Sequence, residues 1–210
     1  MGATATAASV SPPAGDSPVV DVVRPRALAP ATAATDDATL IAACRRGEQR
    51  AMEALYHQYK RRVFGLVHRI VGVADAEEVA QDAFVRAWRA LPAFRREAKF
   101  GTWLHRIVAR LALDRRVQLV ARAKREAPES DAPDPVAPEA GDENERMLAS
   151  LLAELPERAR AAVVLYYYED RSVGEVARIL GVPEGTVKTL LSRARVSLRE
   201  AWARQEARQR

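Results

Sequence analysis

Apolar residues recur at steps of three and four through the first half of the chain, the spacing that places side chains on one face of an α-helix. The longest such stripe consists of Met52, Leu55, Tyr59, Val63, Leu66 and Ile70. Similar stripes occupy 76–88 and 103–111, and Asp75 with Glu78 forms a capping-box pattern that predicts a helix beginning near Asp75. No segment alternates apolar and polar residues with a period of two over a useful length. The pattern therefore predicts an all-α fold.

A second group of helical stripes follows between residues 144 and 204. Its first helix is marked by Met147, Leu148, Leu151 and Leu152. Pro156 suits the first turn of another helix, and Ser172 with Glu175 forms a second capping box. The sequence Gly181-Val182-Pro183 predicts a turn, because Gly commonly ends a helix and Pro is tolerated only outside or at the first turn of the next. Two short helices joined in this way predict a helix-turn-helix.

The second helix of this motif has an apolar inner face and a small, polar and basic outer face. The inner face comprises Val187, Leu191, Ala194 and Leu198. The candidate residues for binding duplex DNA are Gly185, Thr186, Lys188, Thr189, Ser192, Arg193 and Arg195. Lys and Arg can reach guanine acceptors in the major groove, and Thr or Ser can contact bases or phosphates. An ordinary helical hairpin with a solvated basic face would show the same pattern.

Charge divides the 210-residue chain more sharply than hydropathy, although the net charge is only +5. Residues 94–125 carry ten basic and two acidic residues, whereas residues 126–157 carry one basic and ten acidic residues. Residues 158–210 are basic again, with a net charge of +5. Two basic zones separated by an acidic, proline-rich one indicate two folded domains and a linker that is extended by its prolines and by charge repulsion.

The domain organisation that follows has five parts. We expect a disordered Ala-, Thr- and Pro-rich extension (1–35), a helical domain (36–120), an acidic flexible linker (121–143), a helix-turn-helix domain (144–204) and a short tail (205–210).

Aromatic and basic residues interleave at the start of the first basic zone. The residues concerned are Phe94, Arg95, Arg96, Lys99, Phe100, Trp103, Arg106 and Arg110. Aromatic rings between cations suit a single-stranded nucleic acid, because bases stack on the rings while the cations neutralise phosphates. Each aromatic residue taken singly is better explained by packing in the core, but the concentration of positive charge favours nucleic-acid contact.

Other classes of function find little support in the composition. Cys44 is the single cysteine, which excludes an internal disulfide and a cysteine-based zinc site, and the three histidines lack metal-ligand spacing. The longest apolar run has eight residues, too few for a membrane span, and residues 1–10 lack a secretory signal. No nucleophile–base pairing or phosphate loop is visible. We expect a cytoplasmic protein that is not an enzyme and needs no metal or cofactor.

Three motifs in order resemble the group IV, extracytoplasmic-function type of sigma factor of bacterial RNA polymerase. They are Asp75-Ala-Glu-Glu-Val-Ala-Gln-Asp-Ala-Phe84, Phe100-Gly-Thr-Trp-Leu104, and Gly185-Thr-Val-Lys-Thr189 with Ser192-Arg-Ala-Arg195. Together they span most of 36–204, which strengthens the resemblance well beyond any one motif.

The resemblance implies a role for each motif. The helix after Asp75 would dock on the clamp coiled coil of core RNA polymerase through Glu78, Gln81, Asp82 and Arg89. The segment 94–101 would capture an unpaired base of the minus-ten promoter element, with Trp103, Arg106 and Arg110 near the same strand. The helix-turn-helix would read the minus-thirty-five element as duplex. Core polymerase, promoter DNA and an anti-sigma factor are the implied partners, with no membrane insertion.

Two positions depart from the family pattern, and two other functions stay open. Arg110 stands where the family often has Asn, and Leu190 where it often has a second basic residue. A free-standing helix-turn-helix regulator would bind specific duplex DNA without polymerase. A single-strand-binding protein would use 94–116 and would keep its activity without 144–210.

Overall fold

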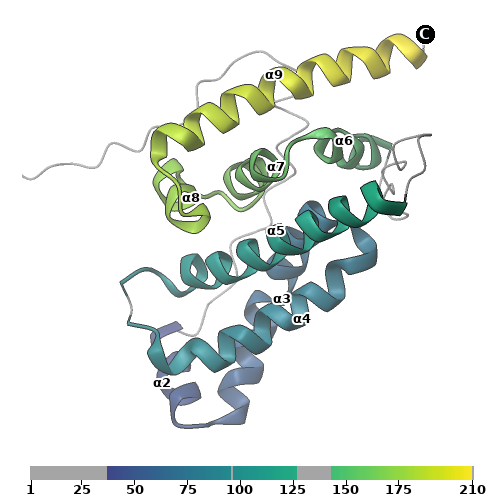
Figure 1. Ribbon diagram of the computed structural model, residues 1–210. Coiled ribbons are helices and arrows are strands. Elements are labelled where there is room, and N and C mark those ends of the chain that lie inside the picture. The colour runs from purple at the N-terminus through teal and green to yellow at the C-terminus, as the bar shows by residue number, and fades with distance from the viewer. Residues whose placement is uncertain (1–36, 96, 127–142, 210) are drawn as a thin grey trace, which may run out of the picture.

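The computed structural model describes residues 37–95, 97–126 and 143–209. The first unit comprises the helices α2 (Asp37–Arg45), α3 (Gln49–Val71), α4 (Val73–Ala90) and α5 (Phe100–Glu126), with a 3-10 turn, η1 (Leu91–Ala93), after α4. α3, α4 and α5 pack against one another, and α2 lies against α3 (Figure 1). The described residues form helices and turns and contain no strand, which confirms the all-α expectation.

The apolar stripe predicted on α3 forms the centre of the first unit. Leu55, Val63, Leu66 and Ile70 are fully buried, each with no exposed surface. α4 presents mostly small residues to this core, among them Ala76, Ala80, Ala83 and Ala87. These small side chains let α4 approach α3 closely, and the polar face on the other side of α4 is left in solvent.

The start of α4 differs from the sequence expectation. The helix begins at Val73, two residues before Asp75, and its N-cap is Gly72 in a left-handed conformation with φ 95°. Gly72 suits this sharp junction between α3 and α4 because it lacks a Cβ. Asp75 therefore lies in the first turn and does not cap the helix. Its carboxylate instead accepts a hydrogen bond of 2.7 Å from Arg115 Nε on α5.

The second unit comprises α6 (Glu143–Glu154), α7 (Glu157–Val163), α8 (Val173–Leu180) and α9 (Glu184–Gln209), with a π-helical turn, η2 (Val164–Tyr168), after α7. α9 packs on α7, α8 and α6. Two helices run past the boundaries expected from the sequence, since α5 continues through Glu126 and α9 through Gln209. Residues 121–126 and 205–209 are therefore helical. The expected extension 1–35 and most of the expected linker lie outside the described residues.

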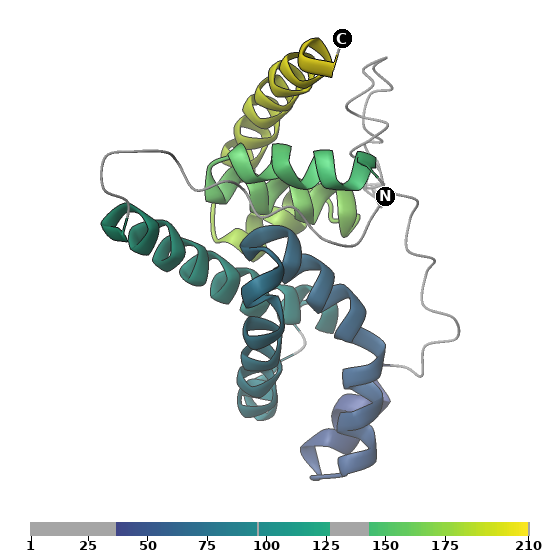
Figure 2. The same ribbon diagram turned by 90° about the vertical axis from the view of Figure 1, so that its right-hand side faces the viewer.

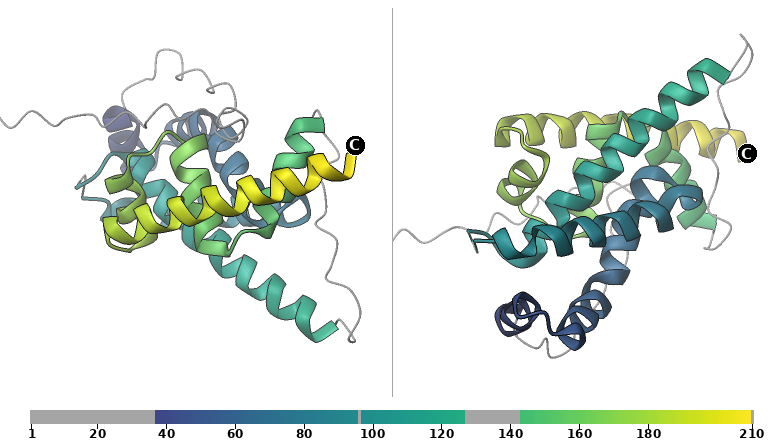
Figure 3. Two further views of the ribbon diagram at one scale, coloured as in Figure 1. Left: turned by 90° about the horizontal axis from the view of Figure 1, so that it is seen from above. Right: turned by 60° about the horizontal axis from the view of Figure 1, so that its bottom comes forward.

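The two units share an interface that the sequence did not predict. α8 and α7 pack on α5, while η2, α6 and α7 contact α3. The buried residues of both units form one continuous hydrophobic cluster. Figures 1 and 3 show the second unit lying over α5, and Figure 2 shows the C-terminal part of α5 projecting beyond it.

Candidate nucleic-acid interface

The helix-turn-helix is built by local hydrogen bonds at both ends of α8. Ser172 Oγ accepts a bond of 3.2 Å from the Glu175 backbone N–H, and the Glu175 carboxylate accepts one of 3.1 Å from the Ser172 N–H. This reciprocal pair is the predicted capping box. At the other end Gly181 adopts φ 66° and donates its N–H to the Ala177 carbonyl. The capping box sets where α8 begins. The turn at Gly181 sets where α8 ends and the direction in which α9 starts.

α9 separates an apolar face from a polar one as predicted. Val187, Leu191, Ala194 and Leu198 are buried against the rest of the second unit. All seven candidate residues of the outer face are exposed: Gly185, Thr186, Lys188, Thr189, Ser192, Arg193 and Arg195. Leu190, which departs from the family pattern, is partly buried and packs against the core. The N-terminal half of α9 thus presents cations, hydroxyls and little side-chain bulk on one open surface.

Two of the interleaved aromatic residues are buried in the core. Phe94 is 5% exposed and Phe100 is 3% exposed, and their ring centroids lie 5.8 Å apart. Phe100 also packs edge-on against Tyr59 of α3, at 5.2 Å. The prediction that these two rings contact an unpaired base is therefore not met in this conformation, because both are already enclosed by the core. Phe100 and Gly101 also belong to α5 and not to the preceding loop.

The cations around this aromatic cluster remain available to a ligand. Arg95, Lys99, Arg106 and Arg110 are exposed, whereas Arg96 lies outside the described residues. Trp103 is partly exposed and lies on both phenylalanines, 4.9 Å from the Phe94 ring and 5.5 Å from the Phe100 ring. The indole is consequently the candidate aromatic surface that a base could reach.

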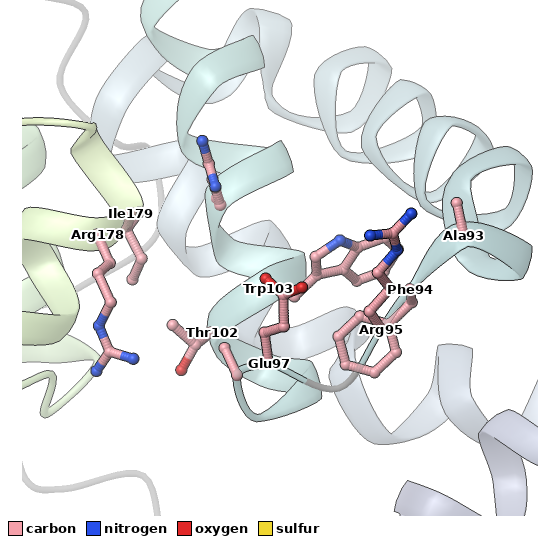
Figure 4. A pocket seen from close by; sticks show the side chains of 10 residues that line it. Ala93, Phe94, Arg95, Glu97, Thr102, Trp103, Arg178 and Ile179 are labelled. Atoms are coloured by element: carbon pink, nitrogen blue, oxygen red, sulfur yellow. The ribbon is translucent and has the colours of Figure 1, made fainter.

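A cleft of about 420 Å³ opens beside this tryptophan, between the two units (Figure 4). The first unit lines it with Phe94, Arg95, Trp103 and Arg106, and α8 lines it with Arg178 and Ile179. The cleft is also lined by Glu97, so three guanidinium groups, one carboxylate and an indole meet at one opening, and this net positive surface is suited to phosphates and bases.

The polar face of α4 is largely free of the core. Glu78, Gln81, Asp82 and Arg89 are all exposed, as expected. Glu78 is partly committed, because its carboxylate pairs with Arg115 Nη2 on α5 at 3.0 Å. Gln81 donates a hydrogen bond of 3.3 Å to the Glu77 carboxylate on the same helix. Asp82 and Arg89 are the members of the set for which such a contact is not observed within the described residues.

Sequence reasoning missed a group of polar residues buried where the two units meet. Arg160 of α7 is 3% exposed and donates from Nη1 to the carbonyl of Ile70, at 3.0 Å. His105 Nε2 of α5 lies 3.6 Å from the carboxylate of Glu169, and both side chains are buried. Neither Arg160 nor the His105–Glu169 pair occupies a recognisable motif. In the sequence, a polar residue at a contact between units cannot be told from one that faces solvent.

Burial also perturbs the protonation of this pair. Desolvation lowers the pKa of His105 to about 3, and the cations Arg171 and Arg62 act in the same direction. Desolvation raises the pKa of Glu169 to about 7, against the attraction of Arg171, Arg62 and Arg69. Both groups are thus driven toward their neutral forms. We assign them a structural role, since neither faces the candidate DNA-binding surfaces.

Other kinds of site find no support in the described residues. No cluster of three or more His, Cys, Asp or Glu within 37–95, 97–126 and 143–209 is placed to hold a metal ion. Among the same residues, none of the helices is long and apolar enough to cross a membrane. Cys44 is buried, and desolvation raises the pKa of its thiol.

Comparisons with known proteins agree with the geometry of both units. Residues 55–122 match the family model for sigma-70 region 2, and residues 145–198 match that for sigma-70 region 4. The chain is 34% identical over 183 residues to the RNA polymerase sigma-H factor of Pseudomonas aeruginosa, covering 79% of this chain and 93% of that protein.

A second curated relative and a solved structure show the same likeness. The extracytoplasmic-function sigma factor SigW of Bacillus subtilis is 33% identical over 175 residues, covering 74% of this chain and 91% of SigW. The structure of CnrH in complex with the cytosolic domain of CnrY superposes with a TM-score of 0.58 at 27% identity, covering 81% of this chain and 97% of CnrH. Both likenesses extend across the two units.

Proposed function

Because the chain belongs to the extracytoplasmic-function (group IV) sigma factors, which direct transcription initiation at promoters, we propose that its two units recognise two separate promoter elements. In this proposal the second unit reads the minus-thirty-five element as duplex. The first unit docks on core RNA polymerase and holds unpaired bases of the minus-ten element. The exposed polar and basic face of α9 is the observation that carries the proposal.

α9 is suited to duplex DNA by its shape and its charge. An α-helix fits the major groove, which is about 12 Å wide. Lys188 and Arg193 project from the exposed N-terminal half of α9, where Gly185 allows close approach of the DNA backbone. Nothing within 4 Å would meet a Cβ at Gly185, so this part of the helix is open to a ligand. Thr189 donates its hydroxyl to the Gly185 carbonyl at 2.9 Å, which leaves its oxygen able to accept.

For the minus-ten element, we propose that the cations and the aromatic residues of the basic segment have different roles. Arg95, Lys99, Arg106 and Arg110 are exposed and would neutralise phosphates of the unpaired strand. The partly exposed ring of Trp103 would stack on a base. Phe94 and Phe100 support that indole from the core, in contrast to the direct base contact inferred from the sequence.

For polymerase docking, we propose the exposed face of α4. The buried alanines anchor this helix to α3, and Arg115 ties its first two turns to α5 through Asp75 and Glu78. The helix is therefore held rigidly from behind, while Asp82 and Arg89 face outward. Opposite charges on one face suit a partner surface that carries the complementary pattern.

We also propose a protein partner that inhibits the factor, an anti-sigma factor. The similar structure of CnrH was solved with the cytosolic domain of CnrY bound to it. The same two-unit architecture gives this chain extensive helical surfaces that such a partner could cover.

Single substitutions in α9 test the proposal directly. Lys188→Ala and Arg193→Ala should each lower binding to a cognate minus-thirty-five duplex by roughly 1–3 kcal/mol, while leaving affinity for core polymerase near that of the unchanged protein. Arg158→Ala is the matched control, because it removes an exposed cation from α7 of the same unit. An equal loss in the control, or a loss that is uniform across all DNA sequences, would contradict sequence-specific reading by α9.

A further inference from the structure

The last residue of α2 is a cation whose side chain is hydrogen-bonded to a distant part of the backbone. Arg45 ends α2, and Ile41 and Cys44 of the same helix are buried. Its guanidinium donates from Nε to the Leu91 carbonyl at 3.4 Å and from Nη2 to the Phe94 carbonyl. These acceptors lie 46 and 49 residues further along the chain. A side chain on a helix that is anchored in the core thus holds a second element of the first unit.

The two carbonyls lie where α4 ends and the chain turns toward α5. Leu91 is the C-cap of α4 and the first residue of η1. Phe94 follows η1 with an extended backbone, at φ −67° and ψ 113°, and begins the connection from η1 to α5. The last carbonyls of a helix have no partner within it. Arg45 therefore caps this end of the helix and fixes the first residue of the η1–α5 connection.

The neighbouring arginine shows what a cation serving only the end of α2 would do. A cation close to the C-terminus of a helix is favourable because of the helix dipole. Arg46 follows α2 directly, and its guanidinium pairs with Glu48 at 2.7 Å, two residues away. The Arg45 side chain instead turns toward η1 and the residue after it. This difference between two adjacent arginines indicates a role for Arg45 outside α2.

The backbone that Arg45 holds carries two parts of the candidate surface for an unpaired strand. The Phe94 ring is 5% exposed, and its centroid lies 4.9 Å from that of the Trp103 ring. The Phe94 carbonyl belongs to the peptide bond with Arg95, an exposed cation. Figure 4 shows Phe94, Arg95 and Trp103 at the same cleft. The supporting ring and the first cation of this surface thus project from the peptide unit that Arg45 binds.

We propose that Arg45 is a positioning residue for the capture of an unpaired strand. It holds the start of the η1–α5 connection in the conformation that presents Arg95 and Trp103 to the nucleic acid. The inference rests on the proposed function of the first unit. Capture then costs less conformational entropy, because this backbone is ordered before the strand arrives. Arg45 acts through the Leu91 and Phe94 carbonyls and contacts neither base nor phosphate.

Limited proteolysis of the full-length chain tests whether Arg45 holds this backbone. Trypsin cleaves after Arg95 when the η1–α5 connection opens, so the cleavage rate reports the population of the open form. Arg45→Met should raise that rate roughly two- to tenfold, as expected for the loss of hydrogen bonds from a charged donor. Arg46→Met removes the adjacent cation and is the matched control, with an unchanged rate. Arg45→Lys keeps the charge but lacks the planar fork that binds two carbonyls, so its rate should lie between.

Promoter opening tests whether this positioning matters for function. With core polymerase, Arg45→Met should slow strand opening roughly two- to tenfold, measured by the permanganate reactivity of unpaired thymines. Its affinities for core polymerase and for the upstream duplex should be unchanged, because the proposed docking face of α4 and the outer face of α9 do not include Arg45. A general loss of folding would lower all three quantities. Arg45→Lys should recover part of the opening rate, and Arg46→Met should open promoters at the rate of the unchanged chain.

The two experiments separate failure of this inference from failure of the proposed function. Equal rates of cleavage after Arg95 in Arg45→Met and in the unchanged chain would overturn the positioning role. Faster cleavage with an unaltered rate of strand opening would also overturn it, because capture would then not need the ordered backbone. If the unchanged chain opened no promoter with core polymerase, the proposed function would be refuted, while the cleavage rates would still report whether Arg45 holds the connection.

Discussion

Replacing either member of the His105–Glu169 pair should add a pH-dependent contribution to the free energy of unfolding, because the contributions of the two residues cancel in the unchanged chain. The folded chain holds Glu169 protonated up to a pKa of about 7, whereas its ordinary value is 4.5. The folded chain keeps His105 neutral down to a pKa of about 3, whereas its ordinary value is 6.5. Between pH 4.5 and 6.5 the folded pair thus holds one proton, on Glu169. The unfolded pair also holds one, on His105, so the pair contributes no slope there.

Each single variant keeps only one of the two groups whose pKa changes on folding, so the two effects on stability no longer cancel. In Glu169→Gln only His105 remains, and the unfolded chain binds the extra proton below pH 6.5. The free energy of unfolding should then fall, relative to the unchanged chain, by about 1.4 kcal/mol for each pH unit of acidification. In His105→Gln only Glu169 remains, and the folded chain binds the extra proton. Its stability should fall by a similar amount as the pH rises from 4.5 toward 7.

Urea unfolding followed by far-ultraviolet circular dichroism at pH 4.5, 5.5 and 6.5 measures these slopes. The difference from the unchanged chain should change by roughly 2 kcal/mol across the two pH units, with opposite signs in the two variants. All other titratable groups are common to the three proteins, so their contributions cancel in the differences. If the difference in the free energy of unfolding did not change with pH in either variant, the assignment of one proton to Glu169 in the folded chain and to His105 in the unfolded chain would be refuted.

Three further predictions follow from the two units. Ser172→Ala removes the capping box and should lower the free energy of unfolding by about 1 kcal/mol, measured by urea titration. Asp82→Arg should weaken capture of core polymerase on an affinity column, whereas Glu53→Arg, at an exposed acid on α3, should have little effect; equal loss would remove Asp82 from the docking surface. Phe100→Ala should cost about 3–5 kcal/mol of stability by opening a cavity in the core, so a fully stable variant would contradict its burial.

The helices themselves were largely predictable because their signals are local. The stripe from Leu55 to Ile70 is buried along its length, and the capping box at Ser172 formed as the residues indicated. The equivalent pattern at Asp75 misled because an acidic residue in the first turn of a helix is also favourable without capping it. The carboxylate of Asp75 is instead bound to Arg115, 40 residues away in sequence, a contact that no local pattern encodes.

The candidate site was predictable where exposure followed helical spacing, as on α9. It was not predictable around Phe94 and Phe100, because an aromatic residue between cations can serve as a stacking surface or as a core anchor. Tyr59 and Trp103 decide this by enclosing the two rings, and that arrangement depends on how three helices meet. The buried Arg160 was missed for a related reason, since its burial is created by contact between the units.

Run-off transcription with purified core RNA polymerase on a library of promoter fragments, with and without this protein, tests the central claim most directly. The account predicts initiation that depends on the protein and is selective for fragments with a defined pair of upstream and downstream elements. Specific binding of duplex DNA by the protein alone, with no dependent initiation on any fragment, would contradict the account and favour a free-standing regulator.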